Sequence, residues 1–327
     1  MGLTATERRA REIQVIGLMR EVFGSPAGFR GLDDDAAVVD ITGNCPTSLV
    51  MTVDAQTSVK DFNLTDDPYL IGRYCCAASA SDLAAMGATP KYLLVDMLLP
   101  FHLDDTFFRR LAEGMMAFAA GCGAIILGGD TERAGSLSRI SVTSVGFCGG
   151  WQPLLRSGAC PGDRVCLVGL AGRPLAESIL NDGRINLAAF LEDIGFAHIG
   201  TALGQSELAD AAMDTSDGIF VTLDSMCQAS GIGCLIDSRS VPLHPRARLA
   251  LDMGLVRIDQ LLASTLSDHL LVMSVPSVNV NKLKELLGAA GALLTNIGVF
   301  VNERSVRATL DDQLIDLGTV VEPDIAE

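Results

Sequence analysis

Five short acidic motifs are spread between residues 33 and 218 of this chain, each beside glycine or at the end of an apolar run. The motifs are Asp33-Asp34-Asp35, Thr52-Val53-Asp54, Ser81-Asp82, Gly128-Gly129-Asp130-Thr131 and Asp214-Thr215-Ser216-Asp217-Gly218. Mg²⁺ prefers hard oxygen ligands, and in nucleotide sites it takes one or two carboxylates plus phosphate oxygens. A glycine beside an acid lets the backbone approach a phosphate closely. Together the motifs predict a site in which Mg²⁺ holds a phosphorylated ligand.

Taken one at a time, each motif also has an ordinary structural explanation. The first fits an acidic turn, Gly128-Gly129-Asp130 fits a tight turn after a strand, and Asp214 with Asp217 fits the start of a helix. Asp82 is harder to explain in this way, because the run from Ala77 to Met86 is otherwise small or apolar and a carboxylate there needs a partner. The occurrence of all five motifs in one chain favours a shared site.

The chain lacks the sequence patterns of the common nucleotide-binding loops. It contains no Gly-x-x-x-x-Gly-Lys-Ser/Thr, no Gly-x-Ser-x-Gly elbow and no protein-kinase signature. No lysine stands in an obvious phosphate loop, so positive charge falls to the metal ions and to Arg156, whose guanidinium suits phosphate. The alternative for Arg156 is a surface turn residue. We expect catalysis by positioning and metal charge, with no catalytic nucleophile among the side chains.

The elements that must position these motifs alternate between strands and helices. Apolar runs predict strands at 36–39, 48–53, 91–99, 124–127, 139–147, 164–168, 234–237, 269–275, 293–301 and 305–310. Periodicity and capping signals predict helices at 6–22, 67–86, 104–121, 217–230 and 278–290, with a mostly helical stretch up to 210. Each half mixes both types, which indicates an α/β or α+β class in two layers. A turn cluster at 156–163 places the domain boundary near it.

Composition and net charge limit the kinds of partner and metal site that the chain can have. The 327 residues are 49% hydrophobic, enough for a large core, and the net charge of −16 argues against nucleic acid and anionic membranes as partners. The nine cysteines show no C-x-x-C spacing and only four histidines accompany them, so a zinc site is not expected. Residues 1–20 do not form a secretory signal, and the longest apolar stretch, 117–129, is too short to span a bilayer. We expect a cytoplasmic protein with buried thiols.

The order and spacing of the motifs resemble the thiamine-monophosphate kinase family. The superfamily includes aminoimidazole ribonucleotide synthetase, selenophosphate synthetase and a hydrogenase maturation protein. The longest matching segments are Leu32–Val39, Ser81–Ala88 and Leu155–Asp163. The resemblance implies a two-domain α+β fold and a homodimer that uses ATP and Mg²⁺. In it, residues 1–150 bind ATP and Mg²⁺ and form the dimer through their sheet, and residues 151–327 form an α/β domain that closes over the nucleotide.

The resemblance also implies a role for each matched residue. The implied Mg²⁺ ligands are Asp34, Asp35, Thr52, Asp54, Asp82, Asp214 and Asp217. The implied contacts to ATP or its phosphates are Gly129, Asp130, Arg156 and Ser216. The reaction implied is phosphorylation of thiamine monophosphate to the diphosphate.

The segments that face the second substrate depart from the family pattern. Asp61 stands in place of a substrate-binding His, and Ser267 stands in place of a Glu that contacts the thiamine part, whereas the following Asp268 is retained. These three residues are the candidate acceptor contacts. Because a cationic thiazolium ring needs an anionic partner, the loss of Glu leaves two further functions open. One is an ATP-dependent kinase or synthetase with another small-molecule acceptor, and the other is a non-catalytic nucleotide-binding homologue.

Overall fold

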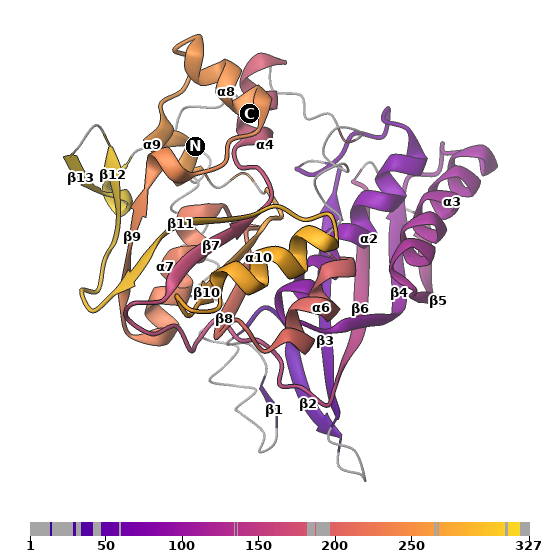
Figure 1. Ribbon diagram of the computed structural model, residues 1–327. Helices are drawn as coiled ribbons and strands as arrows, with labels where there is room; N and C mark the ends of the chain where they lie inside the picture. The colour runs from indigo at the N-terminus through magenta and orange to yellow at the C-terminus, as the bar shows by residue number, and fades with distance from the viewer. Residues whose placement is uncertain are drawn as a thin grey trace.

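The computed structural model describes residues 14, 29–30, 34–41, 47–58, 60–133, 135, 137–181, 187, 197–264, 266, 268–310 and 313–320. Within these ranges the chain forms two mixed sheets, each packed against helices (Figure 1). This arrangement confirms the α+β class. The helix predicted over residues 6–22 lies outside the described residues except for Gln14.

The first sheet has the strand order β1-β2-β3-β6-β4-β5. Its strands are β1 (Phe29–Arg30), β2 (Ala37–Ile41), β3 (Thr47–Thr57), β4 (Thr89–Leu99), β5 (Ile125–Arg133) and β6 (Arg139–Gly149). All neighbours pair antiparallel except β4 and β5, which are parallel because helix α3 (Asp105–Cys122) connects them. In this strand order β5 forms one edge of the sheet and lies three places from β3.

Strand β3 presents its polar side chains to the helix-covered face of this sheet. Val50 is fully buried in a cluster with Leu83 and Met86 at the end of the long helix α2 (Pro68–Ala85). Side chains alternate between faces along a strand, so Thr52 and Asp54 lie on the same face as Val50. Two candidate ligands thus face α2, the helix that carries a third.

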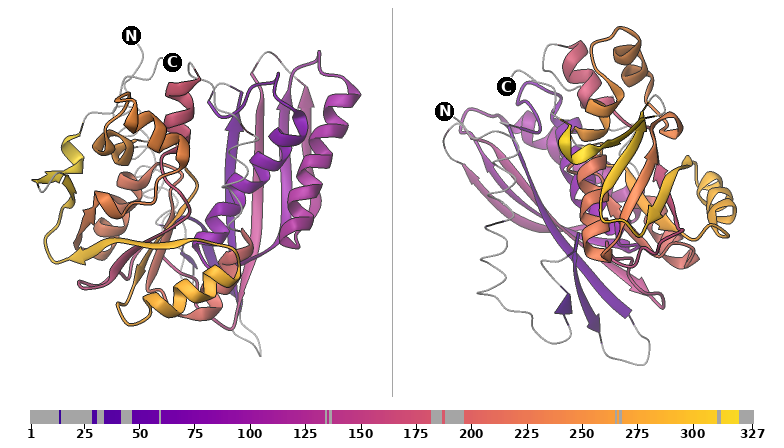
Figure 2. Two further views of the ribbon diagram at one scale, coloured as in Figure 1. Left: turned by 45° about the horizontal axis from the view of Figure 1, so that its top comes forward. Right: turned by 90° about the vertical axis from the view of Figure 1, so that its left-hand side faces the viewer.

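Helix α2 begins and ends where its sequence signals indicate. The Asp67 side chain accepts a hydrogen bond from the Tyr69 N–H, Pro68 occupies the first turn, and Gly87 leaves the helix with φ +67°. Most of the helix is buried, because it contacts the first sheet and α3 as well as β8 and α6 of the second half. Figure 2 shows the two halves side by side with α2 between them.

The second sheet has the order β13-β12-β9-β11-β7-β10-β8. Its strands are β7 (Arg164–Val168), β8 (Ala211–Asp214), β9 (Gly233–Asp237), β10 (Leu271–Val275), β11 (Leu294–Val301), β12 (Val306–Leu310) and β13 (Gln313–Asp316). The helices of this half are α4 (Arg173–Leu180), α6 (Ala197–Ser206), α7 (Ile219–Ser230), α8 (Pro245–Asp252), α9 (Ile258–Ala263) and α10 (Val280–Ala289). Strand β8 lies at the edge of this sheet beside β10, and both strands are buried along their whole length, which fixes the end of β8 at Asp214.

Several predicted elements differ in extent. β5 does not stop at residue 127 but continues through Gly128, Gly129 and Asp130, so the tight turn considered for this motif is wrong. Helix α7 begins at Ile219 with Gly218 as its N-cap, so neither Asp214 nor Asp217 caps it. The predictions do not include strands β1, β8 and β13 or helices α8 and α9. In the described part of the chain, every helix is too short or too polar to cross a bilayer.

Candidate active site

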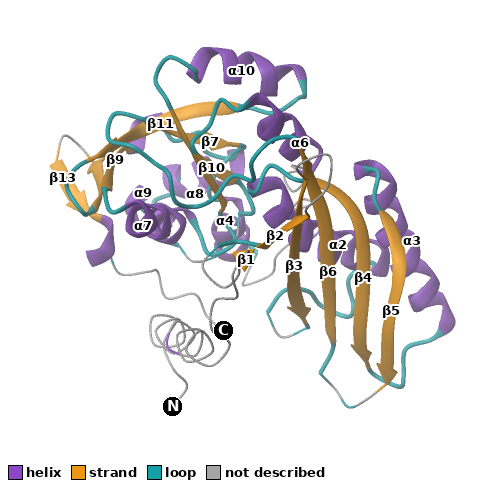
Figure 3. Ribbon diagram, turned by 90° about the horizontal axis from the view of Figure 1, so that it is seen from below, coloured by secondary structure: helices purple, strands orange, loops and turns teal. Residues whose placement is uncertain are grey.

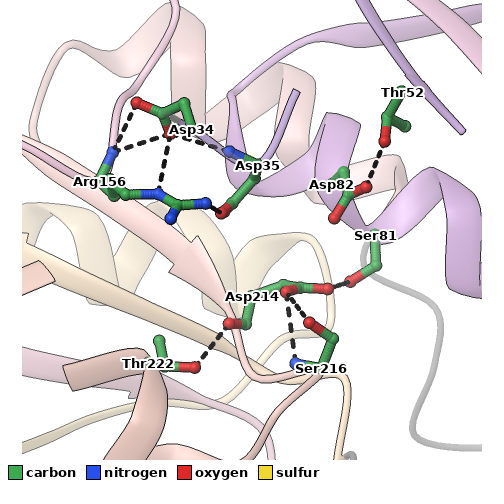
Figure 4. A network of polar contacts seen from close by, with 9 residues as sticks. All are labelled: Asp34, Asp35, Thr52, Ser81, Asp82, Arg156, Asp214, Ser216 and Thr222. Atoms are coloured by element: carbon green, nitrogen blue, oxygen red, sulfur yellow. Dashed lines mark hydrogen bonds and ion pairs between the residues drawn. The ribbon is translucent and has the colours of Figure 1, made fainter. Parts of the chain in front are cut away.

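Acidic side chains from both halves of the chain meet at the junction of the two sheets. Figure 4 shows Asp34, Asp35 and Arg156 as one group, with Asp82 and Asp214 beside it. The first pair precedes β2, Arg156 lies in the segment between the two sheets, Asp82 lies on α2, and Asp214 ends β8. Residues separated by up to 180 positions are therefore brought together, and four of the five motifs contribute to them.

Asp82 has the partner that its apolar surroundings require. Its Oδ2 accepts a hydrogen bond of 2.6 Å from Thr52 Oγ1 of β3. Desolvation raises the pKa of Asp82 well above its ordinary value, and the charges of Asp214 and Asp35 raise it further against the lowering effect of Thr52. Asp82 thus lies in a place that disfavours a carboxylate unless a cation is close.

Asp214 connects the two halves through its carboxylate and is only 2% exposed. Its Oδ2 accepts a hydrogen bond of 2.7 Å from Ser81 Oγ of α2, and its Oδ1 accepts one of 2.9 Å from Ser216 Oγ. Burial raises its pKa, but the nearby His269 and the hydrogen bonds from the Ser81 and Ser216 hydroxyls outweigh burial, so the pKa of Asp214 lies below its ordinary value. The carboxylate is held ionised and in a fixed orientation.

Arg156 forms an ion-paired group with the two acids before β2. Its Nη2 lies 2.6 Å from Asp35 Oδ1, and its backbone N–H donates to Asp34 Oδ1 over 3.1 Å. The Asp35 side chain is 3% exposed. Burial, with repulsion from Asp214 and Asp34, raises the pKa of Asp35 to about 8 despite the opposing charge of Arg156. Its Oδ2 is buried and has no hydrogen-bond partner among the described residues.

Asp54 lies two residues beyond Thr52 on the same face of β3. Its Oδ2 accepts a hydrogen bond of 2.6 Å from Gln56 Nε2, and its Oδ1 accepts one of 2.8 Å from the Ala55 N–H. Burial raises the pKa of Asp54, with His269 acting in the opposite direction. The carboxylate is therefore positioned by its own strand.

The chemistry of this group fits Mg²⁺ held jointly by protein and phosphate. Among the described residues, no three acidic, His or Cys side chains are close enough to enclose a metal ion by themselves. Mg²⁺ commonly takes only one or two carboxylates and completes its shell with phosphate oxygens and water. The buried Asp35 Oδ2 and the raised pKa values of Asp35 and Asp82 indicate carboxylates that a cation would stabilise.

Two predicted nucleotide contacts lie apart from this group within one chain. Gly129 and Asp130 are exposed on edge strand β5, separated from β3 by β6 and β4, which corresponds to about 14 Å at the usual strand spacing. The Asp130 Oδ1 accepts a hydrogen bond from the Thr131 N–H. Asp217 follows Asp214 in the same turn but is exposed.

The candidate acceptor residues have structural partners of their own. Asp61 Oδ2 accepts a hydrogen bond of 2.8 Å from the Thr57 N–H, which holds the turn after β3. Asp268 is buried and its Oδ2 accepts a hydrogen bond of 2.9 Å from the Gly172 N–H. Ser267 lies outside the described residues. His269, which touches the site, was missed because its only sequence signal is a polar pair before an apolar strand.

Comparison with known proteins gives a consistent result for both halves. The family model for the N-terminal domain of AIR synthase related proteins matches residues 33–148, and the model for the C-terminal domain matches residues 194–311. The thiamine-monophosphate kinase of Escherichia coli O157:H7 is 30% identical over 280 residues, covering 82% of this chain and 83% of that protein. The corresponding enzyme of Corynebacterium glutamicum is 33% identical over 242 residues, covering 70% and 71%.

A solved structure described as AaThiL complexed with AMPPCP and TMP has the same fold. Its TM-score is 0.78 at 23% identity, with 95% of each chain covered. The motifs, the domain models, the sequence relatives and the fold all agree, and the chain belongs to the thiamine-monophosphate kinase family.

Proposed function

We propose that this protein transfers the γ-phosphoryl group of ATP to thiamine monophosphate, forming thiamine diphosphate. The observation that carries the proposal is the direct hydrogen bond between Ser81 and Asp214, which holds Asp214 of the second half beside Asp82 of the first. It is supported by the relatives named thiamine-monophosphate kinase and by the solved neighbour, which contains an ATP analogue and TMP. In this proposal residues 1–150 bind ATP and Mg²⁺ and residues 151–327 close over the nucleotide.

The residues of the site divide into metal-binding and phosphate-binding groups. Mg²⁺, when bound, neutralises the charge on the phosphate chain and on the transferring group. Asp82 and Asp214 would hold it, and Asp35, Asp54 and Thr52 would complete the protein ligands. These carboxylates are fixed before ligand binding by their hydrogen bonds, so little freedom is lost when the metal binds. Further metal ligands in the proposal are Asp34 and Asp217.

Arg156 supplies the positive charge on the protein side. Asp34 and Asp35 hold its backbone and guanidinium in the segment between the sheets. If Asp35 serves as a metal ligand, the Arg156 guanidinium would be available for a phosphate, with which it can make paired hydrogen bonds. The hydroxyl of Ser216, which donates to Asp214 Oδ1, would contact the same ligand. This exchange of partners makes nucleotide and metal binding mutually dependent.

A different small-molecule acceptor is the second candidate function. Its support comes from Asp61, whose carboxylate is engaged by Thr57 and so is held in a turn instead of being left for a substrate. The retained Asp268 is similarly engaged by Gly172. Each of these carboxylates holds a backbone turn, so neither takes the place of the Glu that Ser267 replaces, which favours an acceptor without a cationic ring.

We propose that the protein is a homodimer assembled through the first sheet. Figure 3 shows α2 and α3 on one side of β3, β6, β4 and β5, with no described helix on the other side. That open face carries exposed apolar side chains, including Val53 at 66%, Leu127 at 59% and Leu94 at 40%. Clusters of this kind on a sheet mark interaction surfaces. Pairing of two such faces would bring Gly129 and Asp130 of one subunit to the nucleotide of the other.

The buried cysteines agree with a reducing compartment such as the cytoplasm. Adjacent Cys75 and Cys76 are fully buried, and all eight cysteines in the described part of the chain are free thiols.

The decisive experiment follows product formation with purified protein. Incubation with ATP, Mg²⁺ and thiamine monophosphate should release ADP and thiamine diphosphate in equal amounts, measured by chromatography, and EDTA should stop both. Protein that binds Mg²⁺ and ATP without forming thiamine diphosphate would exclude this acceptor and leave the second candidate. Protein that binds neither would exclude both.

A further inference from the structure

A buried histidine faces the carboxylate that joins the two halves. His269 is 4% exposed, and its Nδ1 lies 3.9 Å from Oδ2 of Asp214. The same oxygen accepts the hydrogen bond from Ser81 Oγ, and the other oxygen accepts that from Ser216 Oγ. Asp214 is therefore surrounded by polar groups from three separate segments. His269 belongs to none of the five acidic motifs and has no role in the mechanism proposed above.

The backbone at His269 adopts a conformation that is unusual for a residue with a side chain. Its φ is +45°, and among the described residues only Glu207 also combines a positive φ with a side chain. The next residue, Leu270, exchanges two hydrogen bonds with Thr215: its N–H donates to Thr215 Oγ1, and its carbonyl accepts from the Thr215 N–H. Strain of this kind persists where the surroundings over-determine it, and it is concentrated at functional sites. The turn that follows Asp214 thus holds His269 in place.

The imidazole ring also contacts the other half of the molecule. It packs edge to face against the buried ring of Tyr74, with ring centroids 6.2 Å apart and planes at 77°. Tyr74 and Ser81 lie two turns apart on one face of α2. His269 and Asp214 therefore contact the same face of the same helix.

We propose that His269 is a positioning residue for Asp214: its imidazole, held between Tyr74 and the Asp214 turn, fixes the orientation of the Asp214 carboxylate for a divalent cation. The proposal deepens the proposed function and rests on it for the identity of the ligand. A carboxylate supported on both oxygens meets the cation already oriented. Groups that orient metal ligands in this way typically contribute about 10- to 100-fold in metal affinity.

Two substitutions separate the aromatic ring of His269 from its polar edge, which faces Asp214. His269→Phe keeps an aromatic ring against Tyr74 but removes the ring nitrogens, whereas His269→Asn keeps a polar side chain and tolerates a left-handed backbone. The measurement is calorimetric titration of Mg²⁺ into protein with a non-hydrolysable ATP analogue, at the same pH for all variants. We expect about tenfold weaker Mg²⁺ binding for the Phe variant and a change within about threefold for the Asn variant, both with a Tm near that of the wild type.

Wild-type affinity in a folded His269→Phe variant would overturn the proposal, and so would an equal loss in both variants. If His269→Phe does not fold, Tyr74→Leu provides the test, because it removes the ring that supports the imidazole and leaves His269 intact. Weaker Mg²⁺ binding by this variant supports the proposal, and unchanged binding contradicts it. The readout needs no acceptor, so a wild-type protein that binds Mg²⁺ and nucleotide but does not phosphorylate thiamine monophosphate disproves only the proposed function.

Discussion

At the scale of single residues, the site gathers carboxylates that repel one another. Asp82 and Asp35 have raised pKa values partly because Asp214 stays ionised beside them. When one of several neighbouring acids is ionised, the others keep their protons to higher pH. A metal ion that binds the site must therefore displace these protons. The repulsion between these carboxylates therefore lowers the free energy of unfolding of the metal-free protein, and Mg²⁺ binding raises it again.

Replacing Asp82 with Asn should separate stability from function. The amide keeps an acceptor for the Thr52 hydroxyl but removes a charge near Asp214 and Asp35, so we expect Tm to rise by a few degrees. Loss of a metal ligand should weaken Mg²⁺-dependent ATP binding by about 100-fold or more. Thermal unfolding and calorimetry measure the two effects. The exposed Asp105→Asn variant should change neither, and full activity of Asp82→Asn would refute the proposed metal site.

The raised pKa of Asp35 predicts how stability depends on pH when metal is absent. The folded state holds a proton up to about pH 8, whereas an ordinary Asp releases it near 3.8. The stabilisation of the folded state by this proton is therefore fully present below about pH 4 and is lost as pH rises through about 8. In EDTA, the Tm of the wild type minus that of Asp35→Asn should therefore fall across this range, by about 5 °C or more. A constant difference between the two proteins would show that Asp35 titrates normally.

The sequence predicts the meeting of these acids but not their partners. Asp82 stood out because its neighbours are small and apolar, and the expected partner is present as Thr52. The contacts of Asp61 and Asp268 with backbone N–H groups depend on turns that local sequence does not specify. His269 depends on a tertiary contact with Tyr74, nearly two hundred residues away, and so leaves no local pattern.

At the scale of elements, the close approach of α2 and α3 depends on glycine. A Cβ built on Gly114 of α3 would lie 1.9 Å from the Tyr69 carbonyl oxygen, and one on Gly72 of α2 would lie 2.2 Å from the Leu111 carbonyl oxygen. Both helices cover the helix-facing side of the first sheet. Because α2 also carries Ser81 and Asp82, its distance from α3 helps to set the depth of the site.

The helix contact can be tested with two glycines of the same helix. Gly114→Ala should destabilise the protein by about 2–4 kcal/mol, since the methyl group meets backbone that cannot rotate away. Gly121→Ala should instead stabilise it by about 0.5–1 kcal/mol, because a Cβ there meets nothing within 4 Å and alanine favours helix. Urea unfolding compares the two. Equal effects would show that the helices are not held at this distance.

Elements with strong local signals were predicted best. Helix α2 has Asp67, Pro68 and Gly87 at its ends, and β7 is a short apolar run after a turn cluster. β5 was predicted too short, because Gly128 and Gly129 usually end strands, whereas here the Gly129 backbone pairs with Val95 of β4 and leaves no room for a Cβ. β8 was missed because its small residues follow a helical stretch and become a strand by pairing with β10.

At the scale of the whole molecule, the proposed dimer makes the site a shared structure. If Asp130 acts on the partner's nucleotide, co-expressed Asp82→Asn and Asp130→Asn subunits should recover about a quarter of wild-type activity, since half of the dimers are mixed and each contains one intact site. Thiamine diphosphate formation by the co-purified mixture measures this. Mixing Asp82→Asn with Asp214→Asn should recover nothing. Absence of recovery in the first mixture would place Asp130 in its own subunit's site, whereas about half of wild-type activity would place it outside any site.

The position of α2 also limits how the chain can be recombined. Its residues Ala84 and Ala85 pack in the same cluster as strands of the second sheet, while Leu83 and Met86 pack under the first. A chimera that joins the first half of this chain to the second half of a relative would have to match that buried seam as well as the catalytic acids. Substitutions in one half are therefore expected to be matched by substitutions in the other. Hybrid chains should misfold even where their catalytic acids are all present.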